Sequence, residues 1–221
     1  MDQLILQFFN VEVMAKAWPL LLRGLGMTAL LCLAVIPLGL LGGLLAALAS
    51  TSQSRWLRWP TVALIDLFRA LPPLVLLIFV YSGLPFTGLQ LPPFLAVVIA
   101  FLLNNSAYYG EIIRAGLISV PAGQSEAARS TGLTQSQTLI HVVLPQALRN
   151  VLPDLISNSV EVVKMTSLAS VVSLAELLYS ADMARSVTYN ASPITLAALI
   201  YLILLWPVVR LMSRFQRKIA I

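Results

Sequence analysis

Charged and amide side chains stand inside stretches of the sequence that are otherwise apolar, and these residues could do chemistry. Glu161 and Lys164 lie three residues apart, which places them on one face of a helix. They could simply neutralise each other. Alternatively, they could line a water-filled path, where Glu161 would meet the ammonium group and Lys164 the carboxylate of a zwitterionic solute. Asn104 and Asn105 are further candidates for such a path, although hydrogen bonds between helices explain them equally well.

Two more pairs of opposite charge repeat the spacing of three residues. They are Asp66 with Arg69 and Glu111 with Arg114. Both pairs are predicted to lie near helix ends, where long side chains can reach water. We interpret them as structural ion pairs or as latches of a gate.

Residue types that enzymes need are sparse in this sequence. His141 is the only histidine and no second ligand accompanies it, so neither a metal site nor a catalytic site is predicted. No G-x-x-x-x-G-K-[ST] phosphate loop is present, so the chain is not expected to bind ATP in that way. The formal net charge of +5 does not indicate a nucleic-acid partner, because the basic residues are scattered and gather only at the end of the chain.

The composition indicates an all-α membrane protein with a single transmembrane domain over residues 1–221. Hydrophobic residues make up 59% of the chain, charged residues 10%, and the mean hydropathy is +0.89, whereas a soluble domain carries about 25% charged residues. A membrane crossing takes about 20 apolar residues. Five stretches qualify, at about 18–50, 59–81, 94–113, 151–178 and 194–212. In the first, Gly39 and Gly43 have a spacing that lets another helix approach closely, unless glycine is merely tolerated there.

Proline and polar residues predict how the spans are connected. Pro72 and Pro73 interrupt the hydrogen-bond ladder of the second stretch, so this span should be bent. Residues 82–93 are rich in Gly and Pro and predict a short external turn. Residues 182–190 carry Asp, Arg and Asn and are expected to form a short polar loop.

The basic residues predict the orientation of the chain, since Lys and Arg concentrate on the cytoplasmic side of a membrane. With five spans, nine of them fall on one side: Arg55, Arg58, Arg114, Arg129, Arg149, Arg210, Arg214, Arg217 and Lys218. Three fall on the other: Lys16, Arg23 and Arg185. This bias predicts an external N-terminus, a cytoplasmic C-terminus and a cytoplasmic polar connection at about 121–149.

That connection is predicted to form two short helices joined at a glycine. The first helix can begin near Pro121, whose fixed φ suits an opening turn, and end at Gly132, which can adopt the left-handed conformation. The second can begin at Thr134, which forms a capping box with Gln137. The result is a rigid protrusion of mostly small residues, which suits a groove on another protein.

The residues of this protrusion match a family pattern. Glu126-Ala127-Ala128 is followed by Gly132 and then by Val142-x-Leu144-Pro145. This spacing resembles the EAA loop of the binding-protein-dependent ABC importer permeases, with Val142 in place of Ile as the single departure. Three further segments look like the polar amino acid branch of that family (histidine, glutamine and glutamate permeases): Phe68-Arg69-Ala-Leu-Pro72, Ala107-Tyr108-Tyr-Gly-Glu111 and Lys164-Met-Thr166-Ser167-Leu168.

The resemblance implies a type I ABC importer permease fold with a cytoplasmic EAA coupling-helix loop, in a bacterial inner membrane. It implies no cofactor in this chain, because separate ATPase subunits bind ATP and Mg and hydrolyse the nucleotide. Other implied partners are a second permease subunit, identical or homologous, and a substrate-binding protein that delivers a polar or charged amino acid. The implied coupling residues are Ser125, Glu126, Ala127, Ala128 and Gly132.

The resemblance also favours the pathway hypothesis for the polar positions of the spans. The implied pathway residues are Asn104, Glu161, Lys164, Thr166 and Ser167, the last two as further polar donors. A secondary transporter or channel that works without nucleotide is the alternative, but such proteins usually show internal repeats and ion sites that are not evident here. A small membrane enzyme would need a catalytic constellation, and none is evident.

Overall fold

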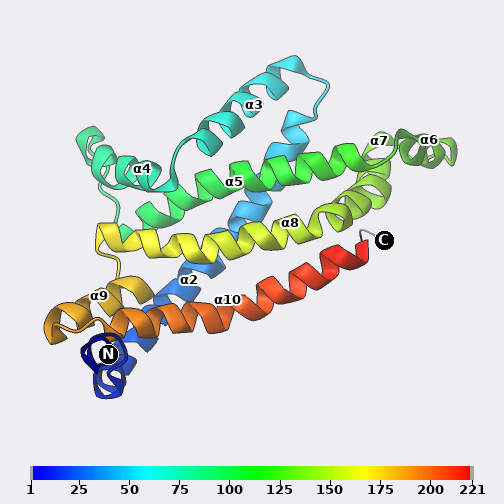
Figure 1. Cartoon of the computed structure of the whole chain (residues 1–221). Helices are drawn as coiled ribbons and strands as arrows, with labels where there is room; N and C mark the ends of the chain where they lie inside the picture. Colours follow the sequence, from blue (N-terminus) through cyan, green and yellow to red (C-terminus); the bar gives the residue numbers. More distant parts are fainter. Residues whose placement is uncertain (1, 220–221) are drawn as a thin grey trace. The chain divides into compact units, whose positions relative to one another are not determined.

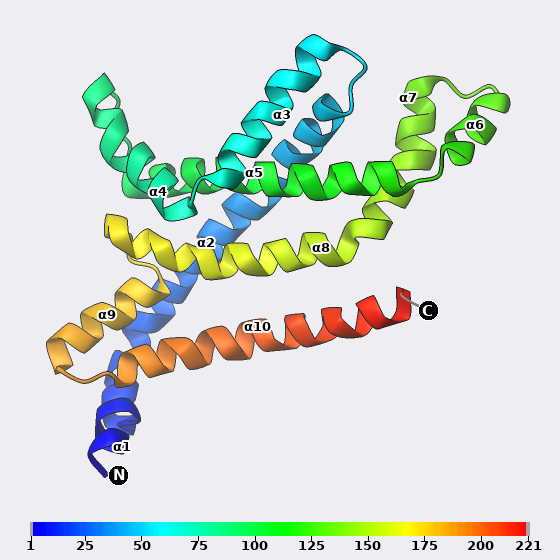
Figure 2. The same cartoon turned by 45° about the horizontal axis from the view of Figure 1, so that its top comes forward.

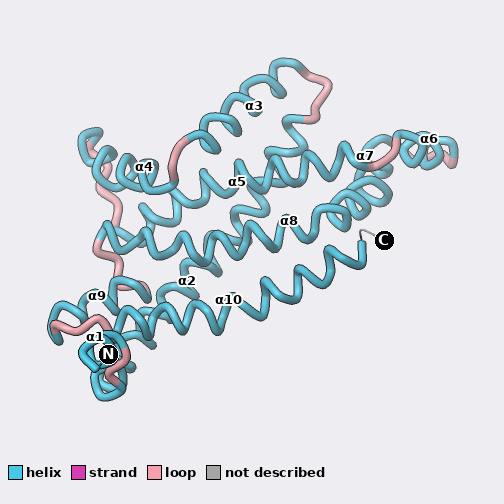
Figure 3. The backbone as a smooth tube through the Cα atoms, in the orientation of Figure 1, coloured by secondary structure: helices cyan, strands magenta, loops and turns pink. Residues whose placement is uncertain are grey.

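The computed structural model describes residues 2–219, with side chains described for residues 3–211. Over that range the chain is helical, with short loops and no strand (Figure 3). In chain order (Figure 1) the helices are α1 Asp2–Phe8, α2 Val11–Ser50, α3 Arg55–Ala70, α4 Pro73–Ile78, a π-helix Phe79–Gly83, a 3-10 helix Leu84–Thr87, α5 Pro93–Ser119, α6 Ala122–Ser130, α7 Gln135–Thr138, a π-helix Leu139–Val143, α8 Leu144–Met165, a 3-10 helix Thr166–Val172, α9 Leu177–Thr188 and α10 Ser192–Ile219.

The candidate membrane spans agree with the prediction of about five crossings. Four continuous stretches are long and apolar enough: Gln3–Ser50, Pro93–Ser119, Gln135–Val172 and Ser192–Leu211. The fifth is a bent pair, Arg55–Ala70 with Pro73–Thr87. Its break lies at Leu71 and Pro72, so the predicted bend at the proline pair is confirmed.

Several predicted boundaries were wrong. The first helix begins at Val11 rather than near residue 18, and the third continues past Arg114 to Ser119. Residues 82–93 are not all turn, because the helical path continues to Thr87 and ends where Gly88 adopts a φ of 87°. Sequence hydropathy located the apolar part of each helix but not its polar ends, which pack or hydrogen-bond in the fold.

The largest error concerns the end of the fourth span. The span ends at Val172, not near residue 178, and the residues predicted as a polar loop form helix α9. Glu176 begins this helix, since its carboxylate accepts hydrogen bonds from the backbone N–H groups of Leu178 and Tyr179 at 2.8 and 2.7 Å. The apolar face of α9 is then buried, which a loop could not achieve.

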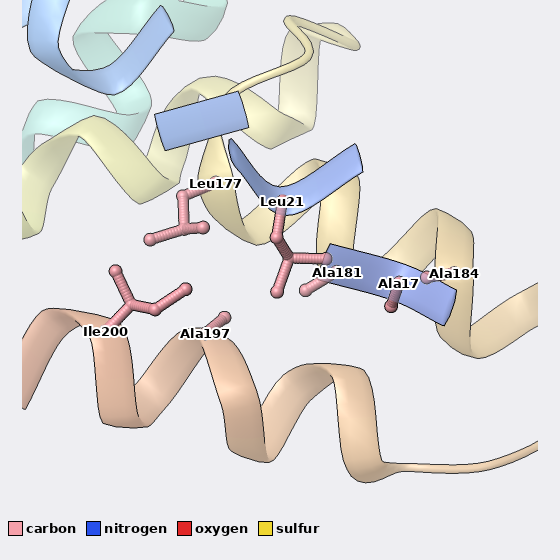
Figure 4. Packing of buried hydrophobic residues seen from close by; sticks show 7 residues of the cluster. All are labelled: Ala17, Leu21, Leu177, Ala181, Ala184, Ala197 and Ile200. Carbon is pink, nitrogen blue, oxygen red and sulfur yellow. The ribbon is translucent and has the colours of Figure 1, made fainter. Parts of the chain in front are cut away.

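Residue contacts divide the chain into two compact units. The first comprises the residues up to Ile36, Pro73–Phe101 and the residues from Val160 onward. Its core brings α2, α9 and α10 together through seven buried residues (Figure 4): Ala17, Leu21, Leu177, Ala181, Ala184, Ala197 and Ile200. Small side chains on α9 and α10 let the helices approach closely.

The second unit comprises Pro37–Pro72 and Leu102–Ser159. Its core contains Ala47, Tyr109, Ile113, Val151 and Leu155, from α2, α5 and α8. At Gly43 a Cβ atom would lie 2.5 Å from the Cβ of Tyr109, so only glycine permits this approach of α2 to α5. The predicted role of Gly39 and Gly43 as close-contact positions is confirmed, since both face Tyr109.

Candidate functional site

The hairpin formed by α6 and α7 joins α5 to α8 (Figure 2). Helix α6 ends at Ser130, and the hydroxyls of Ser130 and Thr131 each donate to a carbonyl of its last turn at 2.7 Å. Gly132 follows with a φ of 91°, which confirms the predicted left-handed glycine joint. These local bonds make the joint a defined turn rather than a flexible link.

The capping box predicted at the start of α7 is present. The backbone N–H of Gln137 donates to Oγ1 of Thr134 at 3.3 Å, and the backbone N–H of Thr134 donates to Oε1 of Gln137 at 2.9 Å. Helix α7 is only four residues long, Gln135–Thr138, before the chain continues as a π-helix into α8. The second helix of the hairpin therefore continues without a loop into the long helical stretch that contains the fourth candidate span.

The predicted coupling residues divide between the inside and the outside of the hairpin. Ala128 is 8% exposed and packs inward, while Glu126, Ala127 and Gly132 are exposed and Ser125 is half-buried. The two alanines thus serve different purposes. Ala128 has a short side chain, so α6 can lie close to the residues after α7. Ala127 is also short, so little side-chain volume projects beside the carboxylate of Glu126.

The foot of the hairpin is held firmly between α5 and α8. A Cβ atom on Gly116 would lie 2.7 Å from the carbonyl oxygen of Ala147, so the two helices touch through backbone at this point. The side-chain amide of Asn150 donates to Oγ of Ser119 at 2.9 Å. Because of these contacts, a displacement of the hairpin reaches both spans at their ends.

The π-helix Leu139–Val143 has a physical cause in the next residues. Pro145 has no N–H group, so the carbonyl of His141 lacks its usual donor four residues on. The wider turn just before this proline accommodates the loss. The side-chain amide of Gln146 donates to the carbonyl of Val142 at 2.8 Å, which satisfies a second group of the same turn.

Asn104 forms a hydrogen bond between helices, which is one of the two roles that the sequence left open. Pro72 and Pro73 cannot donate hydrogen bonds, so the carbonyls of Phe68 and Arg69, each four residues earlier, lose their helical partners. The amide of Asn104 donates to the carbonyl of Phe68 at 2.9 Å. The hydroxyl of Tyr108, one turn further along α5, donates to the carbonyl of Arg69 at 3.3 Å.

Asn105 also bonds between helices of the second unit. Its Oδ1 accepts from the amide of Asn158 at 3.3 Å, and both Asn104 and Asn105 are buried. Of the two explanations offered for these asparagines, the structure supports hydrogen bonding between helices. Asn104 is 2% exposed in the chain, so it presents almost no surface to a solute.

The charge pairs near the ends of α3 and α5 differ from the predicted ones. Glu111 and Arg114 do pair, with Nε of Arg114 donating to Oε2 of Glu111 at 2.8 Å. Arg69, however, lies 3.9 Å from Glu111 and 5.7 Å from the ring centre of Tyr108, and no ion pair within 4.0 Å joins it to Asp66 in the described residues. The predicted Asp66–Arg69 pair is therefore replaced by a contact that ties α3 to α5.

Glu161 and Lys164 form the short-range ion pair that their spacing allows. The ammonium of Lys164 lies 2.6 Å from Oε1 of Glu161, and the two side chains are 51% and 66% exposed in the chain. This pair is exposed in the chain, whereas the carboxylate residue Glu176 is fully buried. The pair thus retains free surface at the end of α8.

Thr166 and Ser167 do not offer free donors. The hydroxyl of Thr166 donates to the carbonyl of Val163, and that of Ser167 to the carbonyl of Lys164, both at 2.7 Å. Thr166 is also completely buried. Their hydroxyls complete the end of α8 where it narrows into the 3-10 helix, and only the lone pairs of Ser167 remain for another group.

Glu176 is a buried carboxylate that the sequence prediction did not single out. Besides capping α9, it accepts a hydrogen bond from the hydroxyl of Tyr201 at 3.4 Å. The next backbone N–H, that of Leu177, donates to Oγ1 of Thr28 at 3.2 Å. The cap therefore connects α9 with α2 and α10 within the first unit.

A comparison with known protein families identifies the family of this chain. Residues 39–221 match the model of the family described as binding-protein-dependent transport system inner membrane component. The chain belongs to this family. It is a transport component of a membrane, and the hairpin of this permease occupies the position that the EAA pattern predicts.

Relatives and solved structures agree over nearly the whole permease chain. It is 36% identical over 210 residues to the Probable amino-acid ABC transporter permease protein YckA of Bacillus subtilis, covering 94% of this chain and 91% of that one. It is 32% identical to the Glutamine transport system permease protein GlnP of Escherichia coli K12, covering 96% and 99%. A crystal structure of an amino acid ABC transporter with histidines superimposes with a TM-score of 0.84 at 38% identity, covering 93% of this chain and 96% of that one.

Proposed function

We propose that this permease forms, with a second permease subunit, the path through which an ATP-driven importer moves a polar or charged amino acid. The names of the relatives YckA and GlnP and of the amino acid ABC transporter support the substrate class. A binding protein delivers the amino acid, and separate ATPase subunits bind ATP and Mg and hydrolyse the nucleotide. The permease contributes no catalytic group to nucleotide hydrolysis.

The single observation that supports the coupling role is the structure of the α6–α7 hairpin. Its tip presents Glu126 and Ala127 outward, its joint is fixed at Gly132, and its foot is clamped at Gly116. A small side chain beside a carboxylate suits a groove with a basic residue on the ATPase. Because the turn is rigid, movement of the ATPase groove would be transmitted to α5 and α8 rather than absorbed.

The single transmembrane domain over 1–221 is proposed to have its N-terminus outside and the hairpin and C-terminus in the cytoplasm. The distribution of Lys and Arg supports this orientation. Three of the basic residues that support it, Arg214, Arg217 and Lys218, have side chains outside the described part of the chain.

We assign Glu161 and Lys164 to the substrate pathway, because they are charged, exposed in the chain and located on a membrane-spanning stretch. An amino acid could replace their mutual contact by binding its ammonium to Glu161 and its carboxylate to Lys164. Thr166 and Ser167 are proposed only as supporting groups at the end of α8, since their hydroxyls donate within the chain. Asn104 is proposed only as a group that holds α5 to α3, since its amide donates to the carbonyl of Phe68. Asp66, Arg69, Glu111 and Arg114 are proposed to latch α3 to α5.

The coupling role is tested by Glu126→Lys in the complete importer reconstituted in vesicles with its binding protein. Reversal of this charge at the docking surface should reduce ATP-dependent uptake by about tenfold or more, while the permease itself stays folded. Amino acid uptake and ATP hydrolysis are measured on the same vesicles.

Glu12→Lys is the matched control, because Glu12 is also an exposed glutamate but lies at the start of α2. It should leave the ratio of uptake to hydrolysis unchanged. Equal losses in both variants, or wild-type uptake in the absence of nucleotide, would overturn the proposed function in favour of a transporter that works without ATPase.

A further inference from the structure

A cavity of about 690 Å³ lies within the second unit, beside the coupling hairpin. The end of α2, the loop before α3, helix α6 and the start of the α7–α8 stretch form its walls. Cavities of about 300–1,000 Å³ are the size class that holds small ligands in proteins.

The walls of the cavity are of two kinds. Leu48, Leu57 and Leu139 supply apolar surface, whereas Ser52, Arg129 and Thr138 supply polar groups. A purely polar metabolite would leave the leucines against water, and a hydrocarbon would bury the arginine without compensation. An amphiphile with a charged head and an apolar tail satisfies both kinds of wall.

Two polar groups of the cavity have no partner in the described part of the chain. Thr138 is 4% exposed, and its hydroxyl oxygen is buried without a hydrogen bond. The Arg129 guanidinium forms no ion pair or hydrogen bond with any described residue. A buried hydroxyl is normally bonded, and a guanidinium matches the oxygens of a phosphate group.

Residues next to the cavity mark the level of the membrane surface. Trp56 and Trp59 are 93% and 65% exposed, and they flank Leu57 of the cavity wall together with Arg58. Exposed tryptophans and arginines at a helix start are typical of the headgroup level of a bilayer. The cavity therefore opens where phospholipid phosphates are located, rather than deep in the hydrocarbon or far out in water.

We propose that this cavity binds one anionic phospholipid, with its phosphate at Arg129 and Thr138 and an acyl chain along Leu48, Leu57 and Leu139. Arg129 belongs to α6 and Leu48 to α2, so the bound lipid joins the coupling hairpin to the first span. The lipid site thus regulates how firmly the hairpin follows the spans. The regulatory part rests on the proposed function, but binding itself does not.

The test measures lipid bound to the purified, delipidated importer complex by native mass spectrometry. Phosphatidylglycerol, phosphatidylcholine and inorganic phosphate are titrated separately. Phosphatidylglycerol should bind with one tight site per permease and the other two probes weakly. Arg129→Gln should weaken this site by about fivefold, and Thr138→Val by about threefold.

Arg55→Gln is the matched control, since Arg55 is an exposed arginine at the start of α3 that does not line the cavity. It should leave the tight site intact. The proposal is overturned if Arg55→Gln weakens binding as much as Arg129→Gln, if inorganic phosphate binds as tightly as the phospholipid, or if the complex binds no phosphatidylglycerol. Because no transport is measured, a failure of lipid binding leaves the coupling experiment with Glu126→Lys undisturbed.

Discussion

The polar residues of α5 and those at the end of α8 lie in comparable stretches of apolar sequence but have opposite environments. Asn104 and Asn105 on α5 are buried and bonded to groups on other helices. Glu161 and Lys164 on α8 are more than half exposed, and among the described side chains they form an ion pair with each other. A polar residue within a span can therefore either bond to a neighbouring helix or remain exposed and able to contact another molecule.

The difference follows from what each helix must contact. Helix α5 lies against α3, whose last carbonyls are left without donors by two prolines, and against α2, which approaches through glycine. Asn104 and Tyr108 on α5 satisfy those backbone carbonyls. At the end of α8 two backbone carbonyls already accept hydrogen bonds from the hydroxyls of Thr166 and Ser167. The charged side chains there are not needed for that purpose. We propose that Glu161 and Lys164 exchange their mutual contact for contacts with a solute.

The largest expected effect comes from disturbing the α2–α5 contact. Gly43→Leu would place atoms against Tyr109 and Gly110, since even a Cβ atom would lie 2.5 and 2.8 Å from them. We expect a loss of stability of about 3 kcal/mol or more, because the backbones must separate. Thermal unfolding of the purified permease in detergent measures this loss. Gly26→Leu in the same helix meets nothing within 4 Å and should unfold close to wild type; similar losses in both variants would contradict the packing role.

A smaller effect is expected from the side chain that compensates for Pro72. Asn104→Leu removes the donor to the carbonyl of Phe68 and leaves that carbonyl unsatisfied, at a cost of about 2 kcal/mol. Tyr108→Phe removes the longer bond to the carbonyl of Arg69 and should cost about 0.5 kcal/mol. Thermal unfolding of both variants, compared with uptake at a temperature where both are folded, separates stability from transport. If Asn104→Leu were stable but inactive, Asn104 would be a direct pathway residue instead.

Local sequence signals predicted some of these features and could not predict others. The glycine joint and the capping box depend on residues within four positions of each other, so Gly132, Thr134 and Gln137 were sufficient to locate them. The carbonyls that Pro72 and Pro73 leave free also follow from the sequence, but the side chains that reach them come from a helix more than thirty residues away. Spacing alone gives no information about such partners.

Helix α9 shows a different kind of failure. Its polar residues suggested a loop, although Leu177, Ala181 and Ala184 repeat at the spacing of a buried helical face. That pattern was available in the sequence and was outweighed by the hydropathy of Asp182 and Arg185. Glu176, an uncommon helix cap, gave no conventional start signal either.

The smallest effect on stability is expected at the end of α8. The same variants test most directly whether the Glu161–Lys164 pair binds the transported amino acid. Glu161→Gln or Lys164→Gln removes an exposed ion pair, which should change the unfolding free energy by less than about 1 kcal/mol. Uptake should nevertheless fall by about tenfold, because a charged contact with the amino acid is lost. The double exchange Glu161→Lys with Lys164→Glu keeps an ion pair at the same spacing but reverses its order. If the pair merely neutralises itself, this exchange restores uptake; if it binds the ammonium and carboxylate of the solute in a fixed direction, uptake remains low while stability returns to the wild-type value.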